Sequence, residues 1–272
     1  MSGGVSTNVS GTLIGTPFAG YERPYWERWL EGYRRAFAGE SVVGLWHCNG
    51  TDPGFADTLR AAADALPFPV RVVHEPWPEP DPATGPGKNA RVRRAWETIF
   101  AEAGEDQEVL CLESDVVCPV GGLARLREGL SRHPALGALS GAIPEHRGPA
   151  GNGTMAWRIH YTEVGDTYTL PPPRQCVSFY PERESGVEMV DAVPFGCLLL
   201  RAETFRAVEI LLDRFPQLGH DQEWSVAAWR AGRPVALDWS VCCGHYRNVY
   251  VPEYEDLRLR MTTGVPTEVT LA

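Results

Sequence analysis

Two carboxylates separated by one residue, Glu113 and Asp115, follow an apolar run that is typical of a buried strand. If the strand continued through them, both side chains would point to the same face. Ligands of open α/β sheets gather at the carboxyl ends of strands, and Mg²⁺ and Mn²⁺ prefer oxygen donors that they share with substrate phosphates. The spacing therefore favours a site for one of these ions, although a solvated turn with two acids has the same pattern.

A second acidic group opens an apolar helical pattern at residues 219–224, which includes His220 and Trp224. Asp221 is a candidate general base that would take a proton from an acceptor hydroxyl, a role that depends on position more than on an unusual pKa. The competing interpretation makes Asp221 a helix N-cap and Glu223 a first-turn acid that the helix dipole favours.

A histidine, His245, follows the apolar residues 241–243 and Gly244, at the end of another expected strand. Imidazole is an acceptable third ligand for Mn²⁺, and the glycine permits close approach. A lone histidine is more often structural, so its role depends on where the fold places it.

The elements that must position these side chains alternate between strand and helix. Apolar runs predict strands at 12–15, 41–48, 70–74, 108–112, 136–143, 188–200 and 234–243, with Thr16 and Pro17 as a turn after the first. Helical spacing predicts helices at 24–37, 55–66, 88–103, 119–133, 201–215 and 222–231. Repeated strand–helix–strand units predict an α/β fold with parallel pairing and helices on both faces of the sheet.

Length and composition are consistent with one globular domain. A chain of 272 residues, 43% hydrophobic and 22% charged, can bury one sizeable core. We expect a loose tail at residues 1–11, a single domain at 12–250 and an irregular tail at 251–272. Residues 75–87, which contain five prolines, are expected to form an irregular loop. Residues 144–186, which are rich in glycine, proline and aromatic residues, are expected to form loops and short strands.

Charge and motif content argue against several classes of protein. The net charge of −10 disfavours duplex nucleic-acid binding, although a bound cation could still attract a small phosphorylated ligand. No apolar run approaches the roughly 20 residues of a membrane span, and residues 1–11 lack a secretory signal, so a cytoplasmic protein is expected. Seven cysteines without a CxxC pair indicate buried thiols. Phosphate loops of the GxGxxG and GxxxxGK types and the GxSxG elbow do not occur.

Taken in order, these segments resemble the GT-A glycosyltransferases, particularly the family-2-like branch. The strand and turn at 41–52, which end in Asn49-Gly50-Thr51-Asp52, are similar to a segment near the nucleotide base in such enzymes. Arg91, near the start of a helix, is similar to a basic residue that reaches the nucleotide. Glu113-Ser114-Asp115 resembles the DxD strand end.

The second half of the chain continues the resemblance. Residues 190–201 are similar to the acceptor-side strand of these enzymes and contain Asp191 and Gly196. Asp221 lies at the position of their catalytic base, with His220 where glutamate is usual. His245 resembles the late histidine that completes the metal site.

The resemblance implies a GT-A, Rossmann-like fold with a mostly parallel sheet, a nucleotide-binding half at 12–143 and an acceptor half at 144–250. It implies transfer of a sugar from a UDP- or GDP-sugar to an acceptor hydroxyl, with Mn²⁺ or Mg²⁺. The candidate base Asp221 favours inversion at the anomeric carbon, and retention stays open. The implied residues are Thr16, Pro17, Asn49, Asp52, Arg91, Glu113, Ser114 and Asp115 for the nucleotide-sugar; Asp191, Gly196, His220 and Trp224 on the sugar and acceptor side; Asp115, His245 and Glu113 for the metal; and Asp221 as base. The acceptor and the oligomeric state stay open.

Two alternatives share this architecture. A sugar nucleotidyltransferase would need a basic, glycine-rich loop after the first strand, whereas residues 15–20 contain no Lys or Arg. A module that binds sugar nucleotides without turnover would keep the fold and the ligands but release no nucleoside diphosphate.

Overall fold

The computed structural model describes residues 11–20, 22–23, 25–77, 86–145, 153–158, 162–164, 167–169, 175–178, 186–209 and 219–246. Most of the expected tail at 1–11, the expected tail at 251–272, the middle of the proline-rich stretch 75–87 and parts of 144–186 lie outside the described residues.

The elements alternate as expected through the first half of the chain. In order they are β1 (Thr12–Phe18), α1 (Trp26–Phe37), β2 (Val42–Cys48), α2 (Pro53–Asp64), β3 (Val70–His74), α3 (Pro86–Glu102), β4 (Val109–Leu112), β5 (Val116–Val117), α4 (Gly122–Arg132) and β6 (Ala138–Ala142). They continue with β7 (Pro144–Glu145), β8 (Gly153–Arg158), β9 (Thr162–Val164), β10 (Thr167–Thr169), β11 (Gln175–Ser178), β12 (Val187–Met189), β13 (Cys197–Leu200), α5 (Ala202–Ala207), α6 (His220–Arg230), β14 (Val235–Cys242) and β15 (Gly244–His245).

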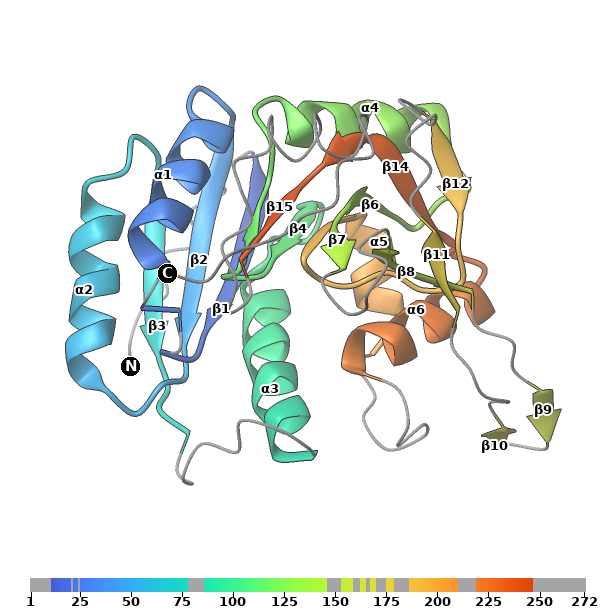
Figure 1. Ribbon diagram of the computed structural model, residues 1–272, viewed down its shortest axis with the longest axis horizontal. Coiled ribbons are helices and arrows are strands. Elements are labelled where there is room, and N and C mark those ends of the chain that lie inside the picture. Colours follow the sequence, from blue (N-terminus) through green and yellow to red (C-terminus); the bar gives the residue numbers. More distant parts are fainter. Residues whose placement is uncertain are drawn as a thin grey trace.

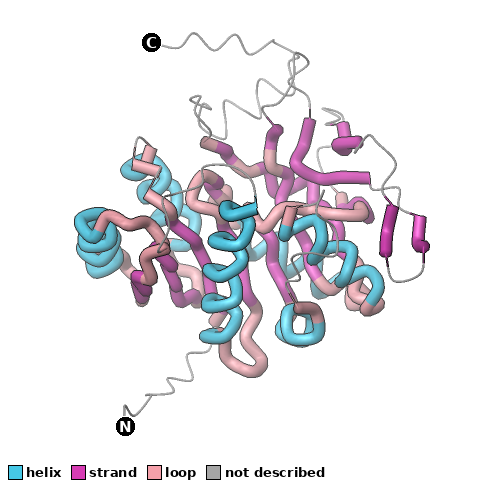
Figure 2. Tube along the Cα trace, turned by 90° about the horizontal axis from the view of Figure 1, so that it is seen from below, coloured by secondary structure: helices cyan, strands magenta, loops and turns pink. Residues whose placement is uncertain are grey.

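An eight-stranded central sheet, in the order β12-β14-β6-β13-β4-β1-β2-β3, organises the fold. Four of its seven neighbouring pairs are parallel, which confirms the mostly parallel sheet. The three antiparallel pairs involve β13, between β4 and β6, and the edge strand β12. In Figures 1 and 2 the β9–β10 hairpin stands apart from this sheet.

Helices cover both faces of the sheet, as the alternation predicts (Figure 1). Buried residues of α1, α2 and α4, such as Trp29, Leu59 and Leu126, form one cluster with Trp46 of β2. The other face carries α3, α5 and α6, which contribute Trp96, Phe205 and Trp224 to a second cluster. Neighbouring residues of one strand join opposite clusters because their side chains alternate across the sheet.

The first strand is longer than predicted. Thr16 and Pro17 do not form a turn but lie within β1, with Pro17 opposite His47 of the parallel strand β2. β1 pairs with β4 only at residues 13–15. Pro17 lies beyond these residues, so its missing N–H removes no hydrogen bond between β1 and β4.

Two predictions for the second half were wrong in detail. The expected strand 188–200 is two strands, β12 and β13, which lie far apart in the sheet order and are joined through a segment containing Pro194. The expected helix 201–215 is helical over Ala202–Ala207, after which Val208 has an extended backbone. Residues 210–218 lie outside the described residues.

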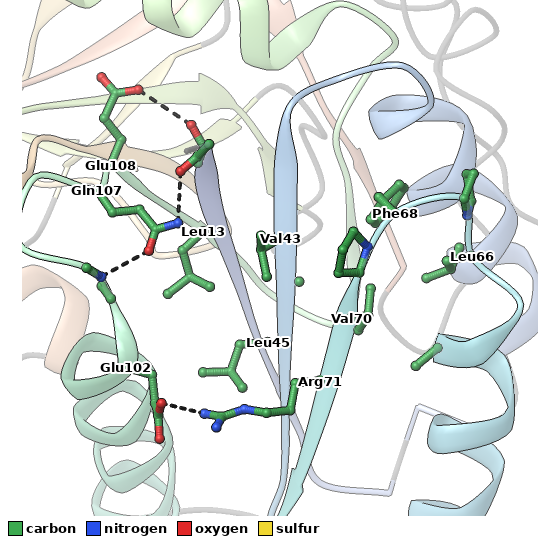
Figure 3. Close-up of a pocket in the computed structure, with 18 of the residues that line it drawn as sticks. Leu13, Val43, Leu45, Leu66, Phe68, Val70, Arg71, Glu102, Gln107 and Glu108 are labelled. Carbon is green, nitrogen blue, oxygen red and sulfur yellow. Dashed lines mark hydrogen bonds and ion pairs between the residues drawn. The ribbon is translucent and has the colours of Figure 1, made fainter. Parts of the chain in front are cut away.

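A hollow of about 1780 Å³ lies at the amino ends of β1, β2 and β3, the opposite ends of these strands from the predicted site (Figure 3). Its walls include Val43 and an ion pair between Arg71 and Glu102, 2.6 Å apart. None of the predicted site residues lines it.

Candidate active site

The Glu113–Asp115 segment is a turn. The amide of Glu113 donates to the carbonyl of Gly196 at 3.1 Å, and the amide of Val116 donates back to the carbonyl of Glu113 at 3.0 Å. The chain therefore leaves the sheet after β4, and the assumption of a continuing strand, on which the same-face argument rested, was wrong. The indole Nε1 of Trp29 holds the far side of the turn by donating to the carbonyl of Val116 at 2.9 Å.

The structure brings Asp115 and His245 together. β15 pairs antiparallel with β5, with His245 opposite Val116, and the amide of Tyr246 donates to the carbonyl of Asp115 at 2.6 Å. As a result His245 Nε2 lies 3.6 Å from Asp115 Oδ2, with side chains 3% and 15% exposed. Asp115 and His245 are 130 residues apart in the sequence, and only the family resemblance had placed both at one metal site.

The pair fits a divalent cation in its donor chemistry. Mg²⁺ lies about 2.1 Å from each ligand, so two ligands of one ion are at most about 4.2 Å apart. The 3.6 Å separation is inside that limit. Such an ion commonly takes one or two protein ligands and fills its remaining positions with water and phosphate oxygens. Within the described part of the chain no third His, Cys, Asp or Glu completes a group around the pair, so Glu113 is not brought in as the third ligand.

The segment 195–196 connects this turn to the helix that carries the predicted base. An added Cβ on Gly196 would lie 3.5 Å from Glu113 Oε2, so the Glu113 carboxylate lies close to Gly196. The adjacent Phe195 packs edge-on against His220, with ring centroids 5.5 Å apart. Glu113 and His220 therefore contact consecutive residues of one segment.

Asp221 lies in the first turn of α6 and is half-buried. The N-cap is Gly219, so the N-cap interpretation of Asp221 is not the one found, although its Oδ1 accepts the amide of Gln222 at 2.8 Å. Ser225 anchors the helix, because its Oγ accepts from the Val193 amide at 3.2 Å. The half-buried Asp191 lies two residues before Val193, the residue that binds Ser225.

Trp224 belongs to the core rather than to a binding surface. Its side chain is fully buried, its ring packs against Phe195, and its indole donates to the carbonyl of Val208 at 3.3 Å.

The predicted nucleotide residues collect at the carboxyl ends of β1 and β2. Asn49 is buried, and its Nδ2 donates to the carbonyl of Arg91 of α3 at 3.3 Å. Asn49 Oδ1 and Thr16 Oγ1 are buried without a hydrogen-bond partner in the described part of the chain. Because buried polar groups are normally satisfied, such atoms are candidates for ligand contact.

Asp52 has a structural role. Its Oδ1 accepts the amide of Gly54 at 2.8 Å, which caps α2, and its Oδ2 pairs with Arg23 on the exposed surface.

Sequence reasoning missed a charged group beside this region. His47 is 1% exposed, and its Nε2 lies 3.3 Å from Glu75 Oε2, which also pairs with Arg94 at 3.8 Å. Burial lowers the pKa of His47 below its ordinary 6.5, while the Glu75 hydrogen bond and charge oppose this shift. A histidine inside an apolar strand pattern carries no signal that separates it from a core residue.

Sequence reasoning also missed Glu22. Its carboxylate is 1% exposed and accepts from the amides of Ala19 and Gly20, at 2.9 and 2.6 Å, and from Ser114 Oγ at 2.9 Å. Desolvation raises its pKa, and these hydrogen bonds oppose the rise. In the sequence Glu22 looks like an ordinary acid before a helix.

Comparison with known proteins finds the same architecture in solved structures. No protein-family profile and no curated protein sequence matches the chain. GalNAc-T7, solved with UDP, GalNAc and Mn²⁺, is similar over 95% of this chain and 52% of its own, with 14% identity and a TM-score of 0.55. The mannosyltransferase PcManGT from Pyrobaculum calidifontis was solved with GDP-Man and Mn²⁺. The similarity covers 93% of this chain and 63% of PcManGT, with 15% identity and a TM-score of 0.55. The similarity to TarS 1–349 of S. aureus covers 84% of this chain and 57% of the TarS chain, with 14% identity and a TM-score of 0.50.

These comparisons bear on the fold. The chain spans between 52% and 63% of the length of these three structures. Among the described helices none is both long and apolar enough to cross a membrane. The eight-stranded mixed sheet, its helical layers and these similarities together show that the chain has the fold of the GT-A glycosyltransferases.

Proposed function

We propose that the chain is a metal-dependent glycosyltransferase that moves a sugar from a nucleoside-diphosphate donor to an acceptor hydroxyl, with inversion at the anomeric carbon. The observation that carries the proposal is the meeting of Asp115 and His245 beyond the carboxyl end of β4, in a GT-A fold. GalNAc-T7 was solved with UDP and Mn²⁺, and PcManGT with GDP-Man and Mn²⁺, which supports a UDP- or GDP-sugar as donor.

Asp115 Oδ2 and His245 Nε2 would hold Mn²⁺ or Mg²⁺ together with the donor diphosphate. When bound, the ion supplies Lewis-acid stabilisation of the charge that develops on the leaving diphosphate. Glu113 would orient the ribose or a water molecule of the site, a role supported by its position at the start of the turn beside Gly196.

The nucleotide would lie across the carboxyl ends of β1 and β2. The unsatisfied Thr16 Oγ1 and Asn49 Oδ1 support this placement, since each could exchange an unmet hydrogen bond for one to the base or ribose. Arg91, whose carbonyl accepts from Asn49, is the cation that we assign to the nucleotide.

Asp221 would take the proton from the acceptor hydroxyl as it attacks the anomeric carbon. Asp221 lies in the first turn of α6, a position that acidic side chains favour because the helix dipole stabilises negative charge there. The edge-on packing of Phe195 against His220 supports a fixed position for the start of this helix relative to the Glu113 turn.

A pair of substitutions with opposite signatures tests these roles. Asp115→Asn should weaken Mn²⁺-dependent UDP or GDP binding by at least about tenfold, or 1.4 kcal/mol, because the amide carries no charge to offset the cation. Asp221→Asn should leave nucleotide binding unchanged and lower sugar transfer by about 10²–10⁴-fold, the range of general-base catalysis. Each variant is the control for the other.

The measurement is calorimetry with UDP and GDP in the presence of Mn²⁺, followed by incubation with a panel of nucleotide-sugars. Binding without release of nucleoside diphosphate would support a non-catalytic module instead. Full transfer activity in Asp221→Asn would refute the base assignment.

A further inference from the structure

The buried carboxylate of Glu22 connects the two ends of the proposed nucleotide site. Glu22 lies in the connection between β1 and α1, and its Oε2 accepts the amide of Gly20 at 2.6 Å. Its Oε1 is shared between the Ala19 amide and the Ser114 hydroxyl, each at 2.9 Å. One side chain thus joins the loop after β1 to the turn that carries Asp115.

The same loop contacts the predicted base-binding segment. The amide of Asn49 donates to the carbonyl of Phe18 at 2.9 Å. An added Cβ on Gly50 would lie 2.8 Å from the carbonyl oxygen of Ala19, so the two segments are in close backbone contact. The loop that Glu22 holds is therefore in contact with Asn49 on one side and, through Ser114, with the metal-binding turn on the other.

The chemistry of this contact requires a carboxylate. Three donors, two amides and one hydroxyl, converge on the two oxygens of Glu22. A glutamine would present an NH₂ group to at least one donor, so it could not accept all three bonds. Burying a carboxylate is costly, and here two backbone amides and one hydroxyl, all uncharged, stabilise it.

The Ser114 hydroxyl is one of the three donors to Glu22. The side chain is 3% exposed and donates to Glu22, in the middle of the turn whose next residue is Asp115. The position of the Asp115 backbone therefore depends on this hydrogen bond together with the Tyr246 amide, which donates to the Asp115 carbonyl at 2.6 Å.

We propose that Glu22 is a positioning residue that, through Ser114, fixes the turn carrying Asp115 for binding of the cation and the donor diphosphate. This inference rests on the proposed function, because it concerns how the cation ligand is held. Glu22 itself is buried and acts through Ser114.

The test uses Glu22→Gln, Ser114→Ala and the double variant, with binding of UDP and of GDP measured by calorimetry with and without Mn²⁺. Each single variant should weaken the Mn²⁺-dependent binding about tenfold, the effect of one hydrogen bond to a charged group. Ser114→Ala leaves the bonds from Ala19 and Gly20 intact and acts on the turn that carries Asp115, so its loss of affinity should be several-fold smaller without Mn²⁺ than with Mn²⁺. Both substitutions weaken the same contact, Ser114→Ala by removing the hydroxyl and Glu22→Gln by removing the charge that the hydroxyl donates to, so the double variant should bind about as tightly as the single variant with the larger loss.

A matched control exists elsewhere in the sheet. Asp238 of β14 is also a buried carboxylate that accepts from a serine, at 2.6 Å from Ser240 Oγ. Asp238→Asn and Ser240→Ala should lower the melting temperature without changing Mn²⁺-dependent binding. A merely structural role for Glu22 would give the same pattern as these controls.

The binding results distinguish failure of the positioning role of Glu22 from failure of the proposed function. Wild-type affinity in Ser114→Ala, multiplicative losses of about 100-fold in the double variant, or equal weakening in Asp238→Asn would each overturn the positioning role. If the wild-type protein binds neither nucleotide in the presence of Mn²⁺, the proposed function fails first, and the inference falls with it.

Discussion

Gly196 offers a test of whether a residue near the site is small for packing or for substrate. Its carbonyl accepts the amide of Glu113, and an added Cβ would lie 2.6 Å from Ile143 Cδ1 and 3.1 Å from Val116 Cγ2. Non-bonded carbons normally lie about 3.5–4.0 Å apart, so Gly196→Ala forces a shift of about 1 Å. Ile143 is 1% exposed and has little room to move.

The expected cost follows from this clash. Overpacking a buried site by one methyl group costs about 1–3 kcal/mol. Ile143→Val removes the Cδ1 atom that the new Cβ would meet and costs about 0.5–1.5 kcal/mol by itself. If the clash is the cause, the double variant should be about as stable as Ile143→Val, with a favourable coupling energy of about 1–3 kcal/mol, the cost of Gly196→Ala by itself.

Urea unfolding followed by tryptophan fluorescence measures these free energies, provided that the m-value stays constant. Additive costs in the double variant would refute the packing argument. Sugar transfer then distinguishes the two roles: recovery of activity together with stability means that the glycine is there for packing. Recovery of stability alone means that it leaves space for the donor or acceptor sugar.

Three further predictions concern groups that the fold positions. Trp29→Phe removes the indole donor to the carbonyl of Val116 and should cost about 1–3 kcal/mol in urea unfolding; a cost below about 0.5 kcal/mol would show that the bond does not hold the turn. The Arg201 guanidinium donates to the carbonyls of Leu136 and Leu130, at 2.8 and 2.5 Å, and a lysine cannot reproduce both bonds. Arg201→Lys should therefore lower the free energy of unfolding by about 1.5–3 kcal/mol in urea, while UDP binding stays unchanged. Because the pKa of His47 is lowered in the folded state, its contribution to stability is complete above its ordinary 6.5 and is lost as pH falls through the lowered value. His47→Gln should therefore flatten the fall of stability between neutral and mildly acidic pH in urea unfolding, and a fall as steep as in wild type would refute this account.

Much of the fold was predictable because it depends on local patterns. Buried strands such as β2 and β4 are continuous apolar runs, and α1 shows aromatic residues at helical spacing, so their types and approximate bounds follow from the order of residues. The acid-bearing strand end at 113–115 and the acids at the start of α6 were recognisable for the same reason. The direction of β13 was not, since a short apolar strand has the same pattern whether its neighbours are parallel or antiparallel.

The sequence by itself determined which residues could do chemistry: a carboxylate after β4, a carboxylate at the start of α6 and a histidine after β14. Only the tertiary structure decided which of them meet. The short β5–β15 pairing sets His245 beside Asp115, and the Ser114 hydroxyl turns inward to Glu22, a residue with no signal of its own in the sequence. Periodicity reports the burial of single elements, whereas contacts between distant segments depend on how the whole sheet and its covering helices pack, which no local pattern records.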